Sequence, residues 1–189
     1  MKTFAISGLF VTLLTASVLL AQEPPKFPTP QKEHELLKQF VGEWESELEA
    51  TAGLGQPAMK CKGTMSSRML GGFWVVSEIN MDMMGMPMKG VQSVGYDSKS
   101  KKYVGTWVDS MTDHLWKYSG SVDGTGKILA LEAEGPNFMT EGKMAMFRDA
   151  YEFKSKDHIV MTSSMQGEDG KWMTFMSGNM HRKASKEKK

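Results

Sequence analysis

The chain has 189 residues, with 23 lysines and arginines against 22 aspartates and glutamates, for a formal net charge of +1 at pH 7. This balance gives no electrostatic reason to expect nucleic-acid binding or steering of an acidic substrate. A single cysteine excludes a disulfide within the chain, and 18 methionines are the compositional anomaly.

The first 21 residues have the layout of a secretory signal peptide. Lys2 precedes an apolar run from Phe4 to Leu20, and the small residue Ala21 follows it. We expect cleavage near Ala21 and a secreted or periplasmic protein with no transmembrane segment after cleavage. The run is short and contains polar residues, so it is marginal as a membrane span. Retention as an uncleaved anchor is the alternative.

Cleavage would leave 168 residues, a usual size for one domain. Residues 22–31 include four prolines between positions 22 and 30, and we expect an exposed linker there. The domain is expected over residues 32–183. A basic, disordered tail is expected over residues 184–189.

The hydrophobic period changes once along the domain. Apolar residues at helical spacing between Gln31 and Val41 predict one short amphipathic helix that ends at Gly42. From Trp44 onward the period is two, which predicts a strand with one solvated face. Turn residues separate nine further predicted strands, at about 58–70, 73–82, 89–96, 102–110, 114–122, 127–134, 143–153, 158–166 and 171–182.

Ten short strands joined by tight turns exclude a parallel α/β sheet, because each parallel crossover would need a helix. We therefore predict an all-β fold, an antiparallel up-and-down barrel of about ten strands with one short N-terminal helix. Closure removes the exposed sheet edges that would otherwise template aggregation. A two-sheet sandwich is the alternative.

A short helix followed by Gly42-Glu43-Trp44 at the first strand resembles the start of lipocalins and their calycin relatives. The resemblance implies that the Trp44 ring closes the barrel base. It also implies that a basic side chain from the last strand, here Arg182, packs across that ring. Gly42, Trp44 and Arg182 are thus expected to be fold residues.

A second resemblance covers roughly residues 33–183. The chain resembles a family of secreted bacterial proteins known as domain of unknown function 1579, which is lipocalin-like. This resemblance implies a fold and an export route and supplies no catalytic residue. It depends on Val41-Gly42-Glu43-Trp44, Arg68-Met69-Leu70-Gly71-Gly72-Phe73, Glu78, Met84-Gly85-Met86-Pro87, Gly95-Tyr96-Asp97, Trp107-Val108-Asp109-Ser110 and Asp169-Gly170-Lys171.

The sequence offers little for catalysis or for a hard metal ion. No Gly-x-Ser-x-Gly elbow is present, and no acid/base pair is readable, so we expect no enzyme. Cys61 lies in an alternating apolar run and is expected to pack as a small hydrophobe. The four histidines show no pair at ligand spacing and are expected at the surface: His34, His114, His158 and His181.

Four charged residues interrupt otherwise apolar strands: Arg68, Glu78, Asp109 and Arg148. Burying such groups is costly unless they pair, so they are either structural pairs at the barrel rim or ligand contacts. Strand parity puts Glu78 on the outer face. It puts Asp109 beside Trp107, pointing into the lumen. We single out Trp107, Asp109 and Arg148 as candidate ligand contacts.

Five methionines lie between Met81 and Met88, in a segment predicted to be a loop. Thioethers select Cu(I), which makes Met81, Met83, Met84, Met86 and Met88 a candidate Cu(I) site. Methionine also suits an adaptable apolar surface, and many other methionines lie in the predicted strands. We favour this second interpretation, with Met83, Met84, Met86 and Met88 at the portal of an apolar pocket.

The leading hypothesis is therefore a non-enzymatic carrier for a small apolar or amphipathic molecule, without a resident cofactor. The first alternative is an extracytoplasmic Cu(I)-binding protein that uses the methionine-rich segment. The second is a structural or envelope-interaction protein whose barrel is filled by its own side chains.

Overall fold

In a computed structural model of the protein, residues 27–51, 56–83 and 85–184 are described. The predicted signal peptide, the first half of the predicted linker (22–26), Met84 and the last five residues lie outside the described residues. Cleavage near Ala21 and export therefore stay predictions. Within the described residues, no helix has the length and apolar character needed to cross a membrane.

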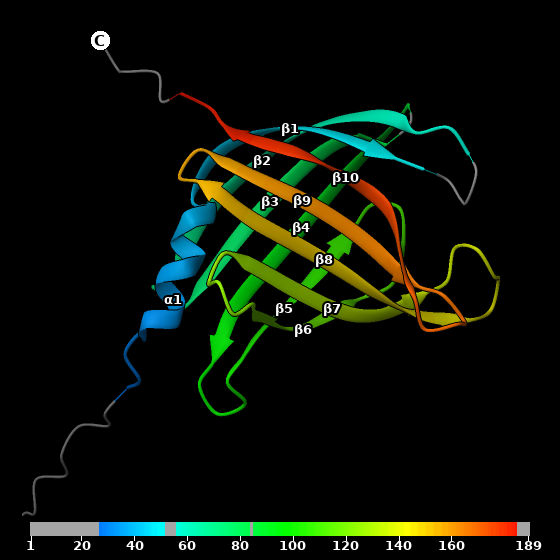
Figure 1. Cartoon of the computed structure of the whole chain (residues 1–189). Coiled ribbons are helices and arrows are strands. Elements are labelled where there is room, and N and C mark those ends of the chain that lie inside the picture. The colour runs from blue at the N-terminus through cyan, green and yellow to red at the C-terminus, as the bar shows by residue number, and fades with distance from the viewer. Residues whose placement is uncertain (1–26, 52–55, 84, 185–189) are drawn as a thin grey trace, which may run out of the picture.

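The described residues form a closed antiparallel barrel of ten strands, with one short helix at one end (Figure 1). The strands are joined in chain order, and β1 pairs with β10 to close the wall. This confirms the predicted fold. The elements are α1 (Lys32–Leu37), the 3-10 turn η1 (Lys38–Phe40), β1 (Gly42–Ala50), β2 (Met59–Leu70), β3 (Trp74–Met83), β4 (Met86–Asp97), β5 (Lys102–Asp109), β6 (Trp116–Val122), β7 (Ile128–Pro136), β8 (Met144–Ser155), β9 (His158–Gln166) and β10 (Trp172–Arg182).

One segment differs from the sequence-based expectation. The methionine-rich segment was predicted to be a loop, but it is a tight β-hairpin. β3 runs to Met83 and β4 starts at Met86, with Met81 opposite Met88 and Met83 opposite Met86. Gly85 has a positive φ of 87°, and its N–H donates to Asp82 Oδ1 at 2.6 Å. A side-chain acceptor plus a glycine suffice for so short a turn, so the methionines remain in the sheet.

The two faces of each strand differ as period-two patterning requires. Along β1, alternate residues from Trp44 to Ala50 are buried while the four glutamates between and before them are exposed. The lower half of the barrel, nearest α1, is tightly packed. Its fully buried side chains include Leu37, Phe40, Trp44, Val75, Val94, Leu129, Leu131 and Ile159, each 0–2 % exposed.

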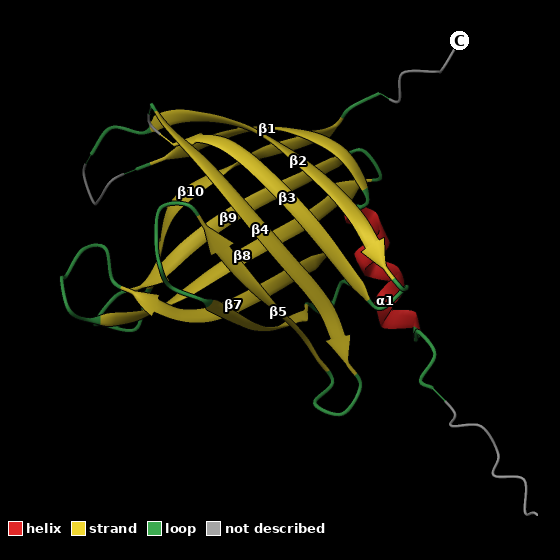
Figure 2. Ribbon diagram, turned by 180° about the vertical axis from the view of Figure 1, so that it is seen from behind, coloured by secondary structure: helices red, strands yellow, loops and turns green. Residues whose placement is uncertain are grey.

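Helix α1 and turn η1 close this end of the barrel (Figure 2). Phe40 enters the core and makes edge-to-face contacts with Tyr151 and Phe153, at centroid distances of 5.1 and 5.0 Å. The indole N–H of Trp44 donates to the Phe40 carbonyl at 2.7 Å, which fixes η1 over the ring. Tyr103 donates its hydroxyl to the Glu33 carbonyl at 2.9 Å.

Arg182 lies at the place the resemblance implied. Its guanidinium carbon is 4.2 Å from the centroid of the Trp44 ring. The same group donates to the carbonyls of Val41, Gln39 (3.0 Å) and Lys156 (2.7 Å). It therefore ties the last strand to the chain between η1 and β1 and to the β8–β9 turn.

Gly42 makes room for this arrangement. Its φ of +123° lies in a region that side chains rarely adopt, and a Cβ there would lie 2.6 Å from an Arg182 nitrogen. Gly42, Trp44 and Arg182 thus act together in sealing the base.

We predict that Arg182→Ala lowers the free energy of unfolding by about 2 to 4 kcal/mol. The change removes a cation–π contact and charge-assisted hydrogen bonds, and it leaves the partly buried carbonyls of Gln39 and Val41 without this partner. Urea unfolding followed by tryptophan fluorescence measures this. Lys183→Ala is the control, since Lys183 only pairs with Glu45 at the surface, and it should cost less than about 1 kcal/mol. Equal losses in the two variants would contradict the assigned role of Arg182.

Candidate functional site

The upper half of the barrel, away from α1, is less tightly filled than the lower half. Several side chains on the inner faces of the strands keep part of their surface accessible to water, although the closed wall surrounds them. These partly accessible inward residues are Ile79, Met81, Trp107, Trp116, Asp149, Met161 and Met176. The inner faces of the upper strands are therefore less completely packed than those near the sealed base.

A polar cluster lies inside the barrel at the bottom of this region. Asp149 on β8 accepts hydrogen bonds from the Tyr118 hydroxyl and from Ser163 Oγ, the latter at 2.5 Å. Next to it, Gln92 Nε2 donates to the Tyr151 hydroxyl at 3.0 Å. The cluster thus joins four strands, β4, β6, β8 and β9, across the interior.

Burial perturbs the acid–base behaviour of this cluster. Desolvation raises the pKa of the Asp149 carboxyl above its usual value, against the smaller lowering effect of the hydrogen bonds from Ser163 and Tyr118. Desolvation, followed by the nearby Asp149 carboxyl, also raises the pKa of Tyr118. Tyr118 therefore stays a hydrogen-bond donor at neutral pH.

Two tryptophans line the wall above the cluster. The Trp107 ring lies over Gly90 on β4, where a Cβ would approach within 2.2 Å, and the Trp116 ring lies over Gly135 in the same way. Asp109 holds Trp107 by accepting from its indole N–H at 2.8 Å. Its other oxygen accepts from backbone N–H groups at the start of the β5–β6 loop.

The opposite wall is rich in sulfur. Met81 and Met83 pack with Met161 and Met176 around a small cluster that contains Leu48, Ala50 and Cys61. Cys61 is fully buried, as expected for a packing role. Met88 is buried, whereas Met86 at the start of β4 is half exposed. The hairpin methionines thus line the inner wall near the barrel mouth.

The mouth itself is apolar. Its exposed hydrophobic residues come from the ends of β2, β4 and β8 and from two loops: Met59, Met86, Met111, Leu115, Phe138, Met139 and Met144. Phe138 in the β7–β8 loop packs on Phe147 and on Phe175, at centroid distances of 5.9 and 5.2 Å. This loop covers one side of the mouth.

The predicted site residues lie on both faces of the barrel wall. Trp107 and Asp109 face the interior together, as their parity predicted, and so do Met83 and Met88; Met84 lies outside the described residues. Arg148, expected in the lumen, lies instead on the outer face. It bonds Glu132 at 2.5 Å and stacks on Trp172. Met144 and Met146 share that outer face.

The reason is the parity of β8. Both faces of this strand carry apolar residues, but the larger rings, Phe147, Tyr151 and Phe153, all lie on the odd positions and are buried. Burial of these rings places Asp149 on the inner face and Arg148 on the outer face.

Sequence reasoning missed Asp149, although its position two residues from both Phe147 and Tyr151 was a usable signal. Arg68 and Glu78 are exposed on the outer face.

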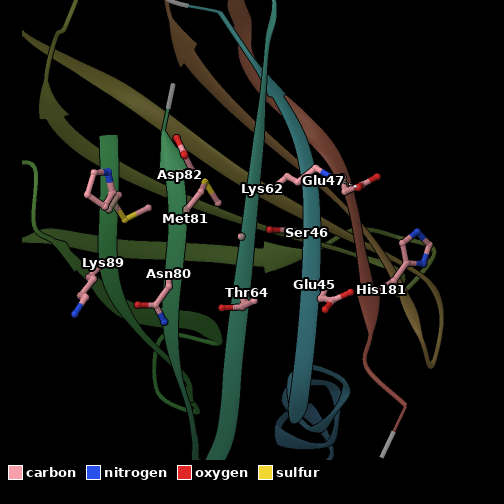
Figure 3. A pocket seen from close by; sticks show the side chains of 13 residues that line it. Glu45, Ser46, Glu47, Lys62, Thr64, Asn80, Met81, Asp82, Lys89 and His181 are labelled. Atoms are coloured by element: carbon pink, nitrogen blue, oxygen red, sulfur yellow. Dashed lines mark ion pairs between the residues drawn. The ribbon is translucent and has the colours of Figure 1, made fainter. Parts of the chain in front are cut away.

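A second hollow lies on the outside of the barrel. It is a groove of about 640 Å³ across β1 to β4, between two cross-strand rows of outward polar side chains (Figure 3). Its floor is the cross-strand row Ser46, Gly63, Met81 and Met88, on the inward-facing positions of these strands. The Lys62–Glu47 ion pair, at 3.2 Å, spans part of it. The groove is open to solvent, with polar rims and a largely apolar floor, and it is not an enclosed site.

Within the described parts of the chain, no group of three or more histidine, cysteine, aspartate or glutamate side chains could hold a metal ion. His158 and His181 stack on the outer face, with ring centroids 4.6 Å apart. His34, expected at the surface, is instead a buried residue of α1, whose ring packs on Phe73 and Tyr96 and whose Nδ1 accepts from the Gln31 N–H at 2.9 Å.

Comparison with known families agrees with this barrel. Residues 29–182 match the family described as "Protein of unknown function (DUF1579)". The chain belongs to this family. No curated protein matches the sequence significantly.

Two solved structures are similar to the barrel at low sequence identity. One is Rv2717c from M. tuberculosis, with a TM-score of 0.59 and 11% identity, covering 82% of this chain and 100% of that one. The other is the S-type phycobiliprotein lyase CPES from Guillardia theta, with a TM-score of 0.55 and 13% identity, covering 82% of this chain and 95% of that one. These likenesses show a lipocalin-like fold.

We predict that the stability of the protein falls as pH rises above about 4, the ordinary pKa of an unfolded aspartate. Because burial raises the folded-state pKa of Asp149, the folded protein binds more protons than the unfolded chain between the two values. The free energy of unfolding then decreases with rising pH in that window. Asp149→Asn removes this pH-dependent loss of stability. The melting temperature of the variant minus that of the natural protein should therefore increase from about pH 4 to about pH 8.

Asp123→Asn is the matched control with the opposite sign. Hydrogen bonds from the Ile128 N–H and from Thr125 lower the pKa of this exposed turn carboxyl. The Asp123 carboxylate stabilises the fold above its unfolded-state pKa, and this contribution is lost as pH falls through its folded-state pKa. The variant should therefore be less stable than the natural protein at neutral pH and about equally stable at low pH. A pH-independent difference for Asp149→Asn would contradict the assignment.

Proposed function

We propose that this protein is a non-enzymatic carrier that binds a small apolar or amphipathic molecule inside the upper barrel. The observation that carries the proposal is the contrast between the two halves of one closed barrel. The lower half is sealed and filled, while inward side chains of the upper half keep water-accessible surface. Concave apolar space with a few convergent polar groups is the usual form of a ligand site.

The lining supports this function. Tryptophans on one wall and methionines on the other offer polarizable, apolar contacts. Burial of a ligand there would contribute about 25 cal/mol for each Å² of apolar surface removed from water. The polar cluster around Asp149 then orients the ligand, and the exposed apolar side chains at the mouth give it a path inward. One structural neighbour is a lyase, so a catalytic role is the alternative that ligand identification would test.

We predict that the fluorescent probe N-phenyl-1-naphthylamine binds in the upper barrel and that Ile79→Trp weakens its binding at least about tenfold, because the larger ring occupies the space. Ile79 faces the interior from β3, and it is only partly buried. Fluorescence titration measures the affinity, and melting curves confirm that the variant folds.

Asn80→Trp is the matched control, since Asn80 is the next residue on the same strand and is exposed on the outer face. The same ring outside the barrel should leave probe binding unchanged. Equal binding by both variants, or none by the natural protein, would favour the alternative of a filled structural barrel.

The alternative, Cu(I) binding by the hairpin methionines, predicts a different bound species. Met81, Met83, Met86 and Met88 form two cross-strand pairs, which brings thioethers together on the inner wall. If they bind Cu(I), native mass spectrometry should show one copper per chain that is lost when Met81 and Met83 are changed to leucine. We expect instead no stoichiometric copper, and a co-purifying organic mass in protein from its own host.

A further inference from the structure

The inner faces of the strands carry an uneven set of charges. Along the described parts of the ten strands, the inward ionisable groups other than tyrosine and cysteine are Asp109 at the mouth, Asp149 deep inside and Arg182 at the base. Arg182 is already committed to the Trp44 ring and to backbone carbonyls. The upper interior therefore contains carboxyl groups without a basic side chain to pair with them.

Of the two carboxyl groups, only Asp149 keeps free hydrogen-bonding capacity toward the interior. Asp109 bonds the Trp107 indole and two backbone N–H groups, so its oxygens serve the β5–β6 loop. Asp149 accepts only from two hydroxyls, Tyr118 and Ser163, and each of its oxygens can accept again. Enclosing a carboxyl without a cation is costly, and the Asp149 carboxyl lies on the inner face of β8 among buried side chains.

The neighbours of Asp149 contribute no competing charge. The titratable groups that face it are Tyr118 on β6 and Tyr151 on its own strand. Ser163 faces it from β9, and the Gln92 amide from β4 bonds Tyr151. Two phenols and an amide supply further hydrogen-bonding atoms around one carboxyl.

We propose that the barrel selects ligands that carry a protonated nitrogen, with Asp149 as its counter-charge and an apolar body lying between the Trp107 and Met81 walls. This inference rests on the proposed function, because it specifies the class of molecule that the same interior binds. Asp149 lies five residues inside the start of β8, about 16 Å along the strand. The preferred ligand is thus an apolar molecule whose amine end enters first.

The test compares three ten-carbon chains that differ only at one end: decylamine, decanol and decanoate. Each competes below its micellar concentration with N-phenyl-1-naphthylamine, an uncharged probe. We expect decylamine to displace the probe about tenfold or more better than decanol, because an ammonium forms a charge-assisted hydrogen bond with the carboxylate. Decanoate, which brings a second negative charge, should compete least well.

Asp149→Asn should abolish the preference for decylamine while leaving the affinity for the uncharged probe nearly unchanged. Glu78→Gln is the control, because it makes the same change of carboxyl to amide on the outer face of β3. That variant should keep the amine preference. Equal displacement by all three chains in the natural protein would overturn the inference and leave the carrier function standing.

The pH dependence in the natural protein gives a second measurement, independent of whether the variant folds. Decylamine stays cationic up to about pH 10, so its affinity should fall at low pH as Asp149 becomes protonated, while the affinity for decanol stays constant. Calorimetry in buffers of different ionisation enthalpy should then detect proton release on decylamine binding. Failure of the uncharged probe to bind at any pH would instead refute the carrier function itself.

Discussion

The Trp44 ring, held between η1 and the Arg182 guanidinium, is the constraint on which the rest of the barrel depends. A ten-stranded barrel has two open ends, and each would expose backbone and apolar side chains to water unless something covers it. Here one end is closed by a residue pair from the first and last strands, together with one short helix. Because strand closure and base closure use the same two residues, a change in either weakens both.

This division of labour explains why the two halves of the barrel differ. The sealed lower half contains aliphatic and aromatic residues with almost no accessible surface, and it contains most of the packing that holds the fold together. The upper half contributes less of this stabilising packing. It can therefore hold a carboxyl, two phenols and flexible thioethers around accessible space, at a cost in stability that the lower half offsets.

Most of the fold could be predicted from the sequence. Period-two patterning and turn residues gave all ten strands to within a few residues, because each strand has one buried and one solvated face. The hairpin at Met83 was the exception. Methionines on both strands obscured the alternation, and the pairing of Met83 with Met86 leaves no polar spacer in the sequence to mark the turn.

The candidate site was less accessible to sequence reasoning, and the physical reason is visible on β8. Arg148 and Asp149 are neighbours on opposite faces, and a shift of one residue exchanges which of them enters the interior. The sequence pattern led us to single out Arg148, a charge in an otherwise apolar strand, as a candidate ligand contact. The structure shows that ring size decides: Phe147 and Tyr151 must be inside, and Asp149 goes with them. The aromatic neighbours of Asp149 thus determine that its carboxyl faces the interior. Burying that charge without a cation costs free energy, and a cationic ligand would offset this cost.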